Sequence, residues 1–130
     1  MADINWLAVL AASIIGFIVG FPWYGALFGK AWRKAVGVPE GSQAGNMGRI
    51  FGLSFVCQLI MSVNLAMFLG PDVTAATGAL YGFLAGFGWV AFALVVNALY
   101  EQKSWQYMTI NGGYWSVTFT LMGLVLGAWH

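Results

Sequence analysis

The side chains that could carry chemistry in this sequence are nearly all neutral. No Asp, Glu, Lys, Arg or His lies within its four long apolar segments, where a proton pathway would need a titratable group. Cys57 is the single cysteine and His130 the single histidine, so the sequence cannot supply a Cys/His metal site. We expect Cys57 to be a small buried hydrophobe. We therefore predict a chain that is not an enzyme and holds no cofactor and no metal.

Neutral polar side chains recur along three of these segments. The candidate polar stripe comprises Ser54, Gln58, Ser62, Asn97, Ser116 and Thr120. One interpretation is a narrow track for a small solute or an ion. The other is hydrogen bonding between helices, at about 0.6 kcal/mol for each bond. We favour the second, and we expect Asn97 and Asn111 to bond to each other because an unpaired amide is costly in hydrocarbon.

Aromatic and charged side chains gather at one side of the expected membrane. The candidate binding site on this cytoplasmic side comprises Trp23, Tyr24, Lys30, Trp32, Tyr100, Glu101, Lys103, Trp105, Asn111 and Tyr114. Such residues also anchor helices at a membrane interface. The cluster nevertheless holds charges of both signs, and we expect Glu101 to pair with Lys103 or Lys30. Ligand binding and anchoring remain alternatives, and the class of any small-molecule ligand is left open.

The composition indicates whether the surface of this chain suits water or lipid. Hydrophobic residues make up 61% of the 130 residues and charged residues 7%, with a mean hydropathy of +0.81. A soluble domain averages about 25% charged residues, so this surface suits lipid better than water. The net charge of +1 gives no reason to expect a nucleic-acid partner. The expected partner is the lipid bilayer.

Four apolar segments define the predicted fold. They cover residues 4–27, 50–69, 74–100 and 107–129, and each reaches the roughly 20 residues that cross a bilayer as a helix. No basic residue precedes the first segment, so we expect it to persist as a helix and not to be cleaved as a signal. Thr74 is a plausible N-cap for the third helix. We predict an all-α integral membrane four-helix bundle, a single transmembrane domain over residues 1–130.

The basic residues predict the orientation of this bundle. Lys30, Arg33, Lys34 and Arg49 flank the first connection, and Lys103 lies in the third. Cytoplasmic loops of membrane proteins carry the excess of Lys and Arg. We therefore expect a multi-pass protein of a bacterial inner membrane, with both termini extracytoplasmic.

Small residues recur at four-residue spacing in three of the segments. The ridges comprise Ala8, Ala12, Gly16 and Gly20, then Gly78, Gly82 and Gly86, then Gly123 and Gly127. Such ridges let helices pack closely, either within a protomer or between protomers. Residues 16–23 also match residues 82–89 at five of eight positions. The match is a candidate duplication that would give two parallel helical-hairpin repeats.

Several of these segments resemble an uncharacterised family. They are residues 5–10, residues 23–32, Tyr100 and Glu101 with Trp105, and residues 110–114. They are similar to a family of small four-helix bacterial and fungal membrane proteins, a domain of unknown function with a Trp-Tyr-x-x-x-Phe-Gly-Lys-x-Trp signature. The resemblance implies the fold and the place of the site, and it implies no activity.

These observations favour a non-enzymatic membrane component. We expect it to pack as a homo-oligomer or as an accessory subunit of a membrane complex. The alternative is a small-solute or ion channel or transporter that uses the neutral polar stripes. The two differ in one respect, because a pathway needs a hydrated lumen and packing does not.

Overall fold

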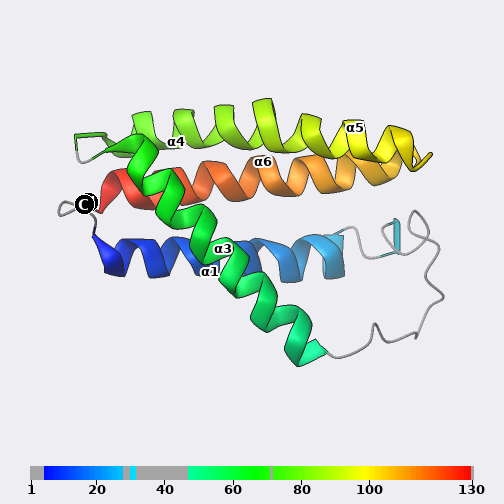
Figure 1. Cartoon of the computed structure of the whole chain (residues 1–130), viewed down its shortest axis with the longest axis horizontal. Coiled ribbons are helices and arrows are strands. Elements are labelled where there is room, and N and C mark those ends of the chain that lie inside the picture. Colours follow the sequence, from blue (N-terminus) through cyan, green and yellow to red (C-terminus); the bar gives the residue numbers. More distant parts are fainter. Residues whose placement is uncertain (1–4, 28–29, 32–46, 71, 130) are drawn as a thin grey trace.

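The computed structural model describes residues 5–27, 30–31, 47–70 and 72–129, and this part of the chain is all-α. Its elements are α1 (Trp6–Pro22), the π-helical turn η1 (Trp23–Leu27), α3 (Met47–Leu69), α4 (Ala75–Ala85), the π-helical turn η2 (Gly86–Ala91), α5 (Phe92–Tyr100) and α6 (Trp105–Ala128). Residues 75–100 run as one long helix through α4, η2 and α5 (Figure 1). The predicted all-α fold of four long helices is confirmed in these residues.

Polar side chains fix where three of the helices begin. The Oδ1 atom of Asn5 accepts hydrogen bonds from the N–H groups of Leu7 and Ala8, at 3.1 and 3.2 Å. The hydroxyl oxygens of Thr74 and Ser104 accept from the N–H groups three residues further along, at 3.2 and 3.1 Å. These caps satisfy N–H groups that have no partner within the helix. The predicted N-cap at Thr74 is confirmed.

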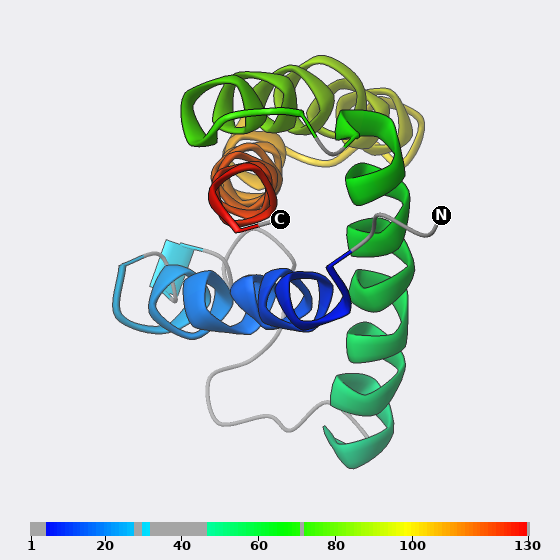
Figure 2. The ribbon, with the colours of Figure 1, turned by 90° about the vertical axis from the view of Figure 1, so that its left-hand side faces the viewer.

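Helix α6 lies at the centre of the bundle. It packs against α1, α3, α4, η2 and α5. The end-on view places α6 between the 75–100 helix and α1, while α3 runs along one side (Figure 2). In Figure 1, α3 crosses the other helices obliquely. The bundle is therefore three roughly parallel or antiparallel helices with a fourth laid across them.

The central position of α6 explains its composition. Residues 6–25, 48–69 and 75–100 form helices that are long and apolar enough to cross a membrane, judged by length and composition. Helix α6 instead buries polar and small residues, among them Asn111, Ser116 and Thr118. Protein surrounds α6 on several sides, which shields its polar groups from lipid. The three apolar helices indicate a membrane protein.

Glycines let α4 and α6 approach to backbone contact. A methyl group added at Gly82 would overlap the carbonyl oxygen of Phe119. Gly78 and Gly123 meet reciprocally, because a methyl group on either would overlap the carbonyl oxygen of the other. The Hα atoms that take the place of these methyl groups point at carbonyl oxygens, an arrangement typical of weak Cα–H···O bonds between helices. These two ridges therefore serve packing within the protomer.

The ridge of α1 also faces the protomer interior. Ala8 and Ala12 are fully buried, and Gly16 lies against the side-chain amide of Gln58 from α3. Gly20 lies under the ring of Tyr114 from α6. All three ridges are thus used inside the protomer, an alternative that the sequence leaves open.

The start of α1 and the end of α6 lie at the same end of the bundle (Figures 1 and 2). The side-chain amide of Asn5 donates to the carbonyl oxygen of Trp129 at 3.4 Å. The turn between α3 and α4 is at this end, and Gly70 adopts a φ of 79° there, in the region that favours glycine. The turn between α5 and α6, which carries Lys103, lies at the opposite end. The turn with Lys103 therefore lies at the opposite end of the bundle from the start of α1 and the end of α6.

Orientation can be tested with single cysteines. In a Cys57→Ser background, Ser42→Cys is expected to react with a membrane-impermeant maleimide only after cells are opened. Asp72→Cys, in the turn at the other end, is expected to react in intact cells, because Lys and Arg are retained in the cytoplasm. Labelling is read by mass shift on a gel. The reverse pattern would overturn the predicted orientation.

Candidate functional site

Three side-chain hydrogen bonds tie the end of α1 to α6. The indole N–H of Trp23 donates to the carbonyl oxygen of Ile110 at 2.9 Å. The hydroxyl of Tyr24 donates to Oδ1 of Asn111 at 2.7 Å, and that of Tyr114 donates to the carbonyl oxygen of Gly16 at 2.6 Å. The rings of Tyr24 and Tyr114 pack at a centroid distance of 5.1 Å. This cluster joins positions from two distant parts of the sequence.

The π-helical turn η1 gives this cluster its geometry. Pro22, the last residue of α1, has no N–H, and its ring disfavours a regular α-helical turn. The N–H of Trp23 still bonds to the carbonyl oxygens of Val19 and Gly20, four and three residues back, and beyond it the helix continues as the π-turn η1. A π-turn is wider than an α-turn, so the consecutive residues Trp23 and Tyr24 can both reach α6. Pi-helical turns of this kind occur frequently at functional sites.

Beside the cluster is a groove of about 400 Å³. Trp23 forms one wall, and Phe87 of η2 with Phe92 of α5 forms the other. Trp105 also lines the groove, and Gly112 and Gly113 form part of its floor on α6. We call it the aromatic groove. Both walls contain a π-helical turn, one from each copy of the candidate repeat.

The aromatic groove is apolar although two of its lining residues carry hydroxyl groups. The hydroxyl of Thr109 donates to the carbonyl oxygen of Trp105 at 2.8 Å. The hydroxyl of Ser116 donates to the carbonyl oxygen of Gly112 at 2.7 Å. Both donors are therefore used within α6, as is common for such residues inside helices. The groove mainly offers rings, methyl groups and glycine backbone.

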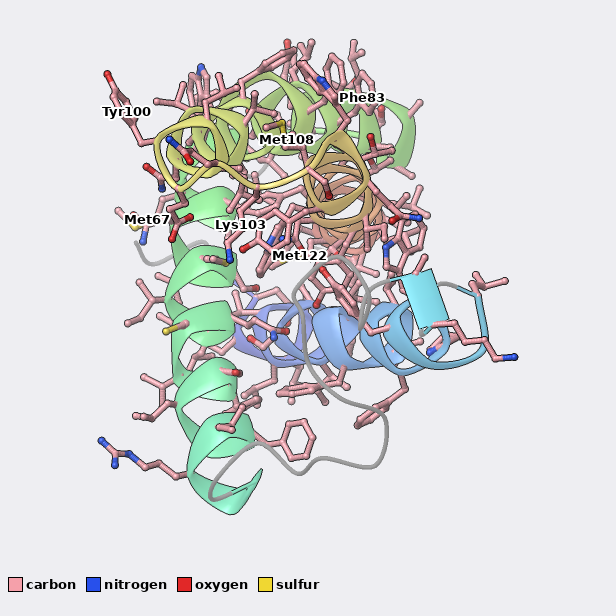
Figure 3. The ribbon with its side chains drawn as sticks, turned by 90° about the vertical axis from the view of Figure 1, so that its right-hand side faces the viewer. Met67, Phe83, Tyr100, Lys103, Met108 and Met122 are labelled. Atoms are coloured by element: carbon pink, nitrogen blue, oxygen red, sulfur yellow. The ribbon has the colours of Figure 1, made fainter. Side chains whose placement is uncertain are left out.

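The remaining residues of the predicted binding site do not join the cluster. Tyr100 is 87% exposed and projects away from the bundle (Figure 3). Lys103 is half-buried, with Nζ 5.6 Å from the ring centroid of Tyr107. Glu101 and Lys30 are exposed, and among the described residues Glu101 forms no ion pair, so the expected pairing is wrong. The reason is that Lys103 turns to an aromatic ring instead. Trp32 lies outside the described residues.

The polar stripe is divided between internal bonds and the surface. Ser62 donates to the carbonyl oxygen of Val9 at 2.9 Å, and Thr120 donates to that of Ser116 at 2.6 Å. Gln58 is 5% exposed, and its Oε1 has no hydrogen-bond partner among the described residues. Ser54 is half-buried.

Two expectations about single side chains are wrong. Asn97 is exposed, and Asn111 accepts from Tyr24 instead, so the two amides do not pair. The buried face of α5 is at Ala98, the next residue, which turns Asn97 outwards. Cys57 is exposed and not buried, because Gln58, one residue further on, occupies the inward face of α3.

Sequence reasoning missed three features of this region. Ser13 is fully buried and donates to the carbonyl oxygen of Val9 at 2.7 Å, beside Ser62. Thr118 is fully buried with no hydrogen-bond partner for Oγ1 in the described part of the chain. The paired glycines at 112 and 113 open the floor of the groove. A signal was present for Ser13, which adjoins the small-residue ridge of α1.

Comparison with known proteins gives one family. Residues 7–127 match the family described as "Protein of unknown function (DUF1761)". The match spans nearly all of the described helices. No curated protein and no solved structure matches the chain. The match agrees with the resemblance that the sequence predicts.

Proposed function

The chain belongs to the DUF1761 family, whose function is unknown, and we propose that it is a non-enzymatic membrane component that binds a second copy of itself. The alternative partner is a larger membrane complex in which the chain is an accessory subunit. Both roles require a surface that the internal packing leaves free, and α3 provides one.

The exposure of α3 supports this proposal. Leu53, Val56 and Ile60 are 56%, 49% and 57% exposed. A methyl group at Gly52 would meet no other atom within 4 Å. Lipid or another helix must cover this face, and a glycine favours a helix because it lets a second backbone approach closely. Gly78, Gly82 and Gly123 cannot do this, since they already lie in the contact between α4 and α6.

A small-solute or ion pathway is the second candidate, supported by two buried polar atoms that have no hydrogen-bond partner in the described part of the chain. Gln58 Oε1 and Thr118 Oγ1 could solvate a passing ion or water molecule. Gln58, however, is packed against Gly16, and the aromatic groove is apolar. A dry contact of this kind favours the packing role.

Cross-linking at Cys57 tests the proposed self-association. A homobifunctional maleimide applied to membranes is expected to give a covalent dimer of the 14.0-kDa chain, because the thiol is exposed on α3. Gly52→Leu should reduce the dimer severalfold, whereas Gly88→Leu, at another open position, should not. The yield is measured on denaturing gels, with Cys57→Ser as the blank.

Two results would count against self-association. An adduct with a different protein would favour the accessory-subunit alternative. If only the monomer is found at every cross-linker length, the α3 face is covered by lipid and the proposal fails.

A further inference from the structure

We propose that the aromatic groove binds one acyl chain of an anionic phospholipid, whose headgroup lies at the end of the bundle that carries Lys103 and Trp105. The inference concerns a surface separate from the exposed face of α3, and it does not depend on self-association. It is argued from the shape, the chemistry and the charge around the groove.

The groove is formed before any ligand arrives. The indole of Trp23 is held by its bond to the Ile110 carbonyl, so this wall cannot swing into the floor. On the opposite wall, Phe87 packs against Phe92 at a centroid distance of 5.2 Å and against Phe83 at 5.3 Å. A methyl group at Gly113 would meet the Trp23 ring at 3.0 Å, so a glycine there keeps the floor and the wall in contact. A preformed site loses little entropy when it binds.

The lining selects hydrocarbon over a polar ligand. Thr109 and Ser116 direct their hydroxyl hydrogens to backbone carbonyls of α6. A polar molecule in the groove would give up its own hydrogen bonds and find few replacements. The exposed rings of Phe87, Phe92 and Trp105 continue directly from the groove onto the apolar outer surface. A lipid chain can therefore enter sideways from the bilayer.

The size of the groove disfavours a helix of a second copy. One turn of a helix about 10 Å wide and 5.4 Å long already occupies roughly 400 Å³. The groove of about 400 Å³ therefore holds little more than a single turn, too short a contact to define a helix–helix interface. A flexible chain, by contrast, can follow the groove and leave it at either end.

Charge indicates which lipid is retained. The acyl chain of the lipid is already in hydrocarbon before it enters the groove. Apolar contact alone therefore gives little selectivity between one lipid and another. Lys103 lies in the turn directly before Trp105, and Lys30 follows η1 on the side of Trp23. Glu101 is the acidic residue of the same turn, and Asp72 lies in the turn at the opposite end. Basic residues beside a membrane surface attract anionic headgroups, so the retained lipid is expected to be anionic.

Native mass spectrometry of the purified full chain in detergent tests the proposal. The probes are phosphatidylglycerol and phosphatidylcholine with identical acyl chains. Wild type is expected to retain one phosphatidylglycerol about tenfold better than phosphatidylcholine, the effect of one or two basic side chains near the headgroup. Val117→Phe, which places a ring in the groove, should lower this retention severalfold. Ile60→Phe, on the exposed face of α3, should leave it unchanged.

A second measurement tests the proposal even if Val117→Phe, the variant that fills the groove, fails to fold. Brominated acyl chains quench nearby tryptophan, and Trp105 is 73% exposed, so Trp105→Ala should fold and lose part of the quenching. Equal retention of both lipids by all variants would mean an ordinary lipid shell and would overturn the proposal. Loss of a second copy of the chain, rather than of lipid, in Val117→Phe would also overturn it.

Discussion

Gly82→Leu is expected to lower the free energy of unfolding by about 3 kcal/mol or more. Gly82 is buried in α4, and a methyl group there would overlap the Phe119 carbonyl on α6. A backbone carbonyl within a helix cannot move aside as a flexible side chain can. Leucine would therefore force α4 and α6 apart and also separate Gly78 from Gly123. Thermal unfolding in detergent, followed by circular dichroism, measures the loss.

Gly88→Leu is the matched control for this change. Gly88 belongs to η2, only six residues further along the same long helix, and a methyl group there would meet no atom within 4 Å. Its cost should be within about 0.5 kcal/mol of zero, with the higher helix propensity of leucine acting in its favour. Equal stability of Gly82→Leu and wild type would mean that α4 and α6 do not make backbone contact in the folded protein.

The sequence predicts the helices because hydrophobic length is a direct requirement of the bilayer. The four expected segments agree with the observed elements to within three residues at each end, from 6–27 for the first to 105–128 for the fourth. The small-residue ridges mark the faces of α4 and α6 that meet, although the sequence leaves open whether they pack within a protomer or between protomers. On α3, the four-residue spacing of Gln58 and Ser62 puts both on one helix face, and both are buried. Periodicity contains this information because it defines a face.

The oblique crossing of α3 and the two π-turns could not be predicted in the same way. A crossing angle depends on how side-chain ridges of two helices fit, which requires the partner to be known. Pro22 indicates a disturbance at the end of α1, but it does not specify a π-turn over a kink or a helix end. The candidate repeat at residues 16–23 and 82–89 adjoins a π-turn in each copy, and the duplication stays a prediction.

The candidate site shows the same limit at the level of single residues. Sequence placed Trp23, Tyr24, Trp105, Asn111 and Tyr114 at one end of the bundle, and the structure brings them to one cluster and its adjoining groove. The sequence could not assign the hydrogen-bond partner of Asn111. Tyr24 reaches this amide only because the π-turn changes the direction in which the side chain points. Partner choice therefore depends on local helix geometry that residue types do not encode.

Tyr114→Ala is expected to cost about 3 kcal/mol of stability, mainly through the cavity left by the ring. Tyr114 is 7% exposed, and its ring packs against Tyr24 at 5.1 Å, against Trp115 at 4.8 Å and over Gly20. In a membrane the transfer term of such a change is small because lipid is also apolar, so the lost packing dominates. Denaturation in mixed micelles of a mild detergent and sodium dodecyl sulfate measures the cost.

Tyr114→Phe separates the ring from its hydroxyl. This variant keeps the packing and removes only the bond to the Gly16 carbonyl, which can still accept within α1, so it should cost about 0.6 kcal/mol. A cost equal to that of Tyr114→Ala would mean that the hydroxyl bond, and not the ring, holds α1 against α6. If neither variant changes stability, the contact between Tyr114 and the end of α1 does not contribute to the fold. The two variants together therefore test whether the side-chain cluster that joins the end of α1 to α6 also stabilises the bundle.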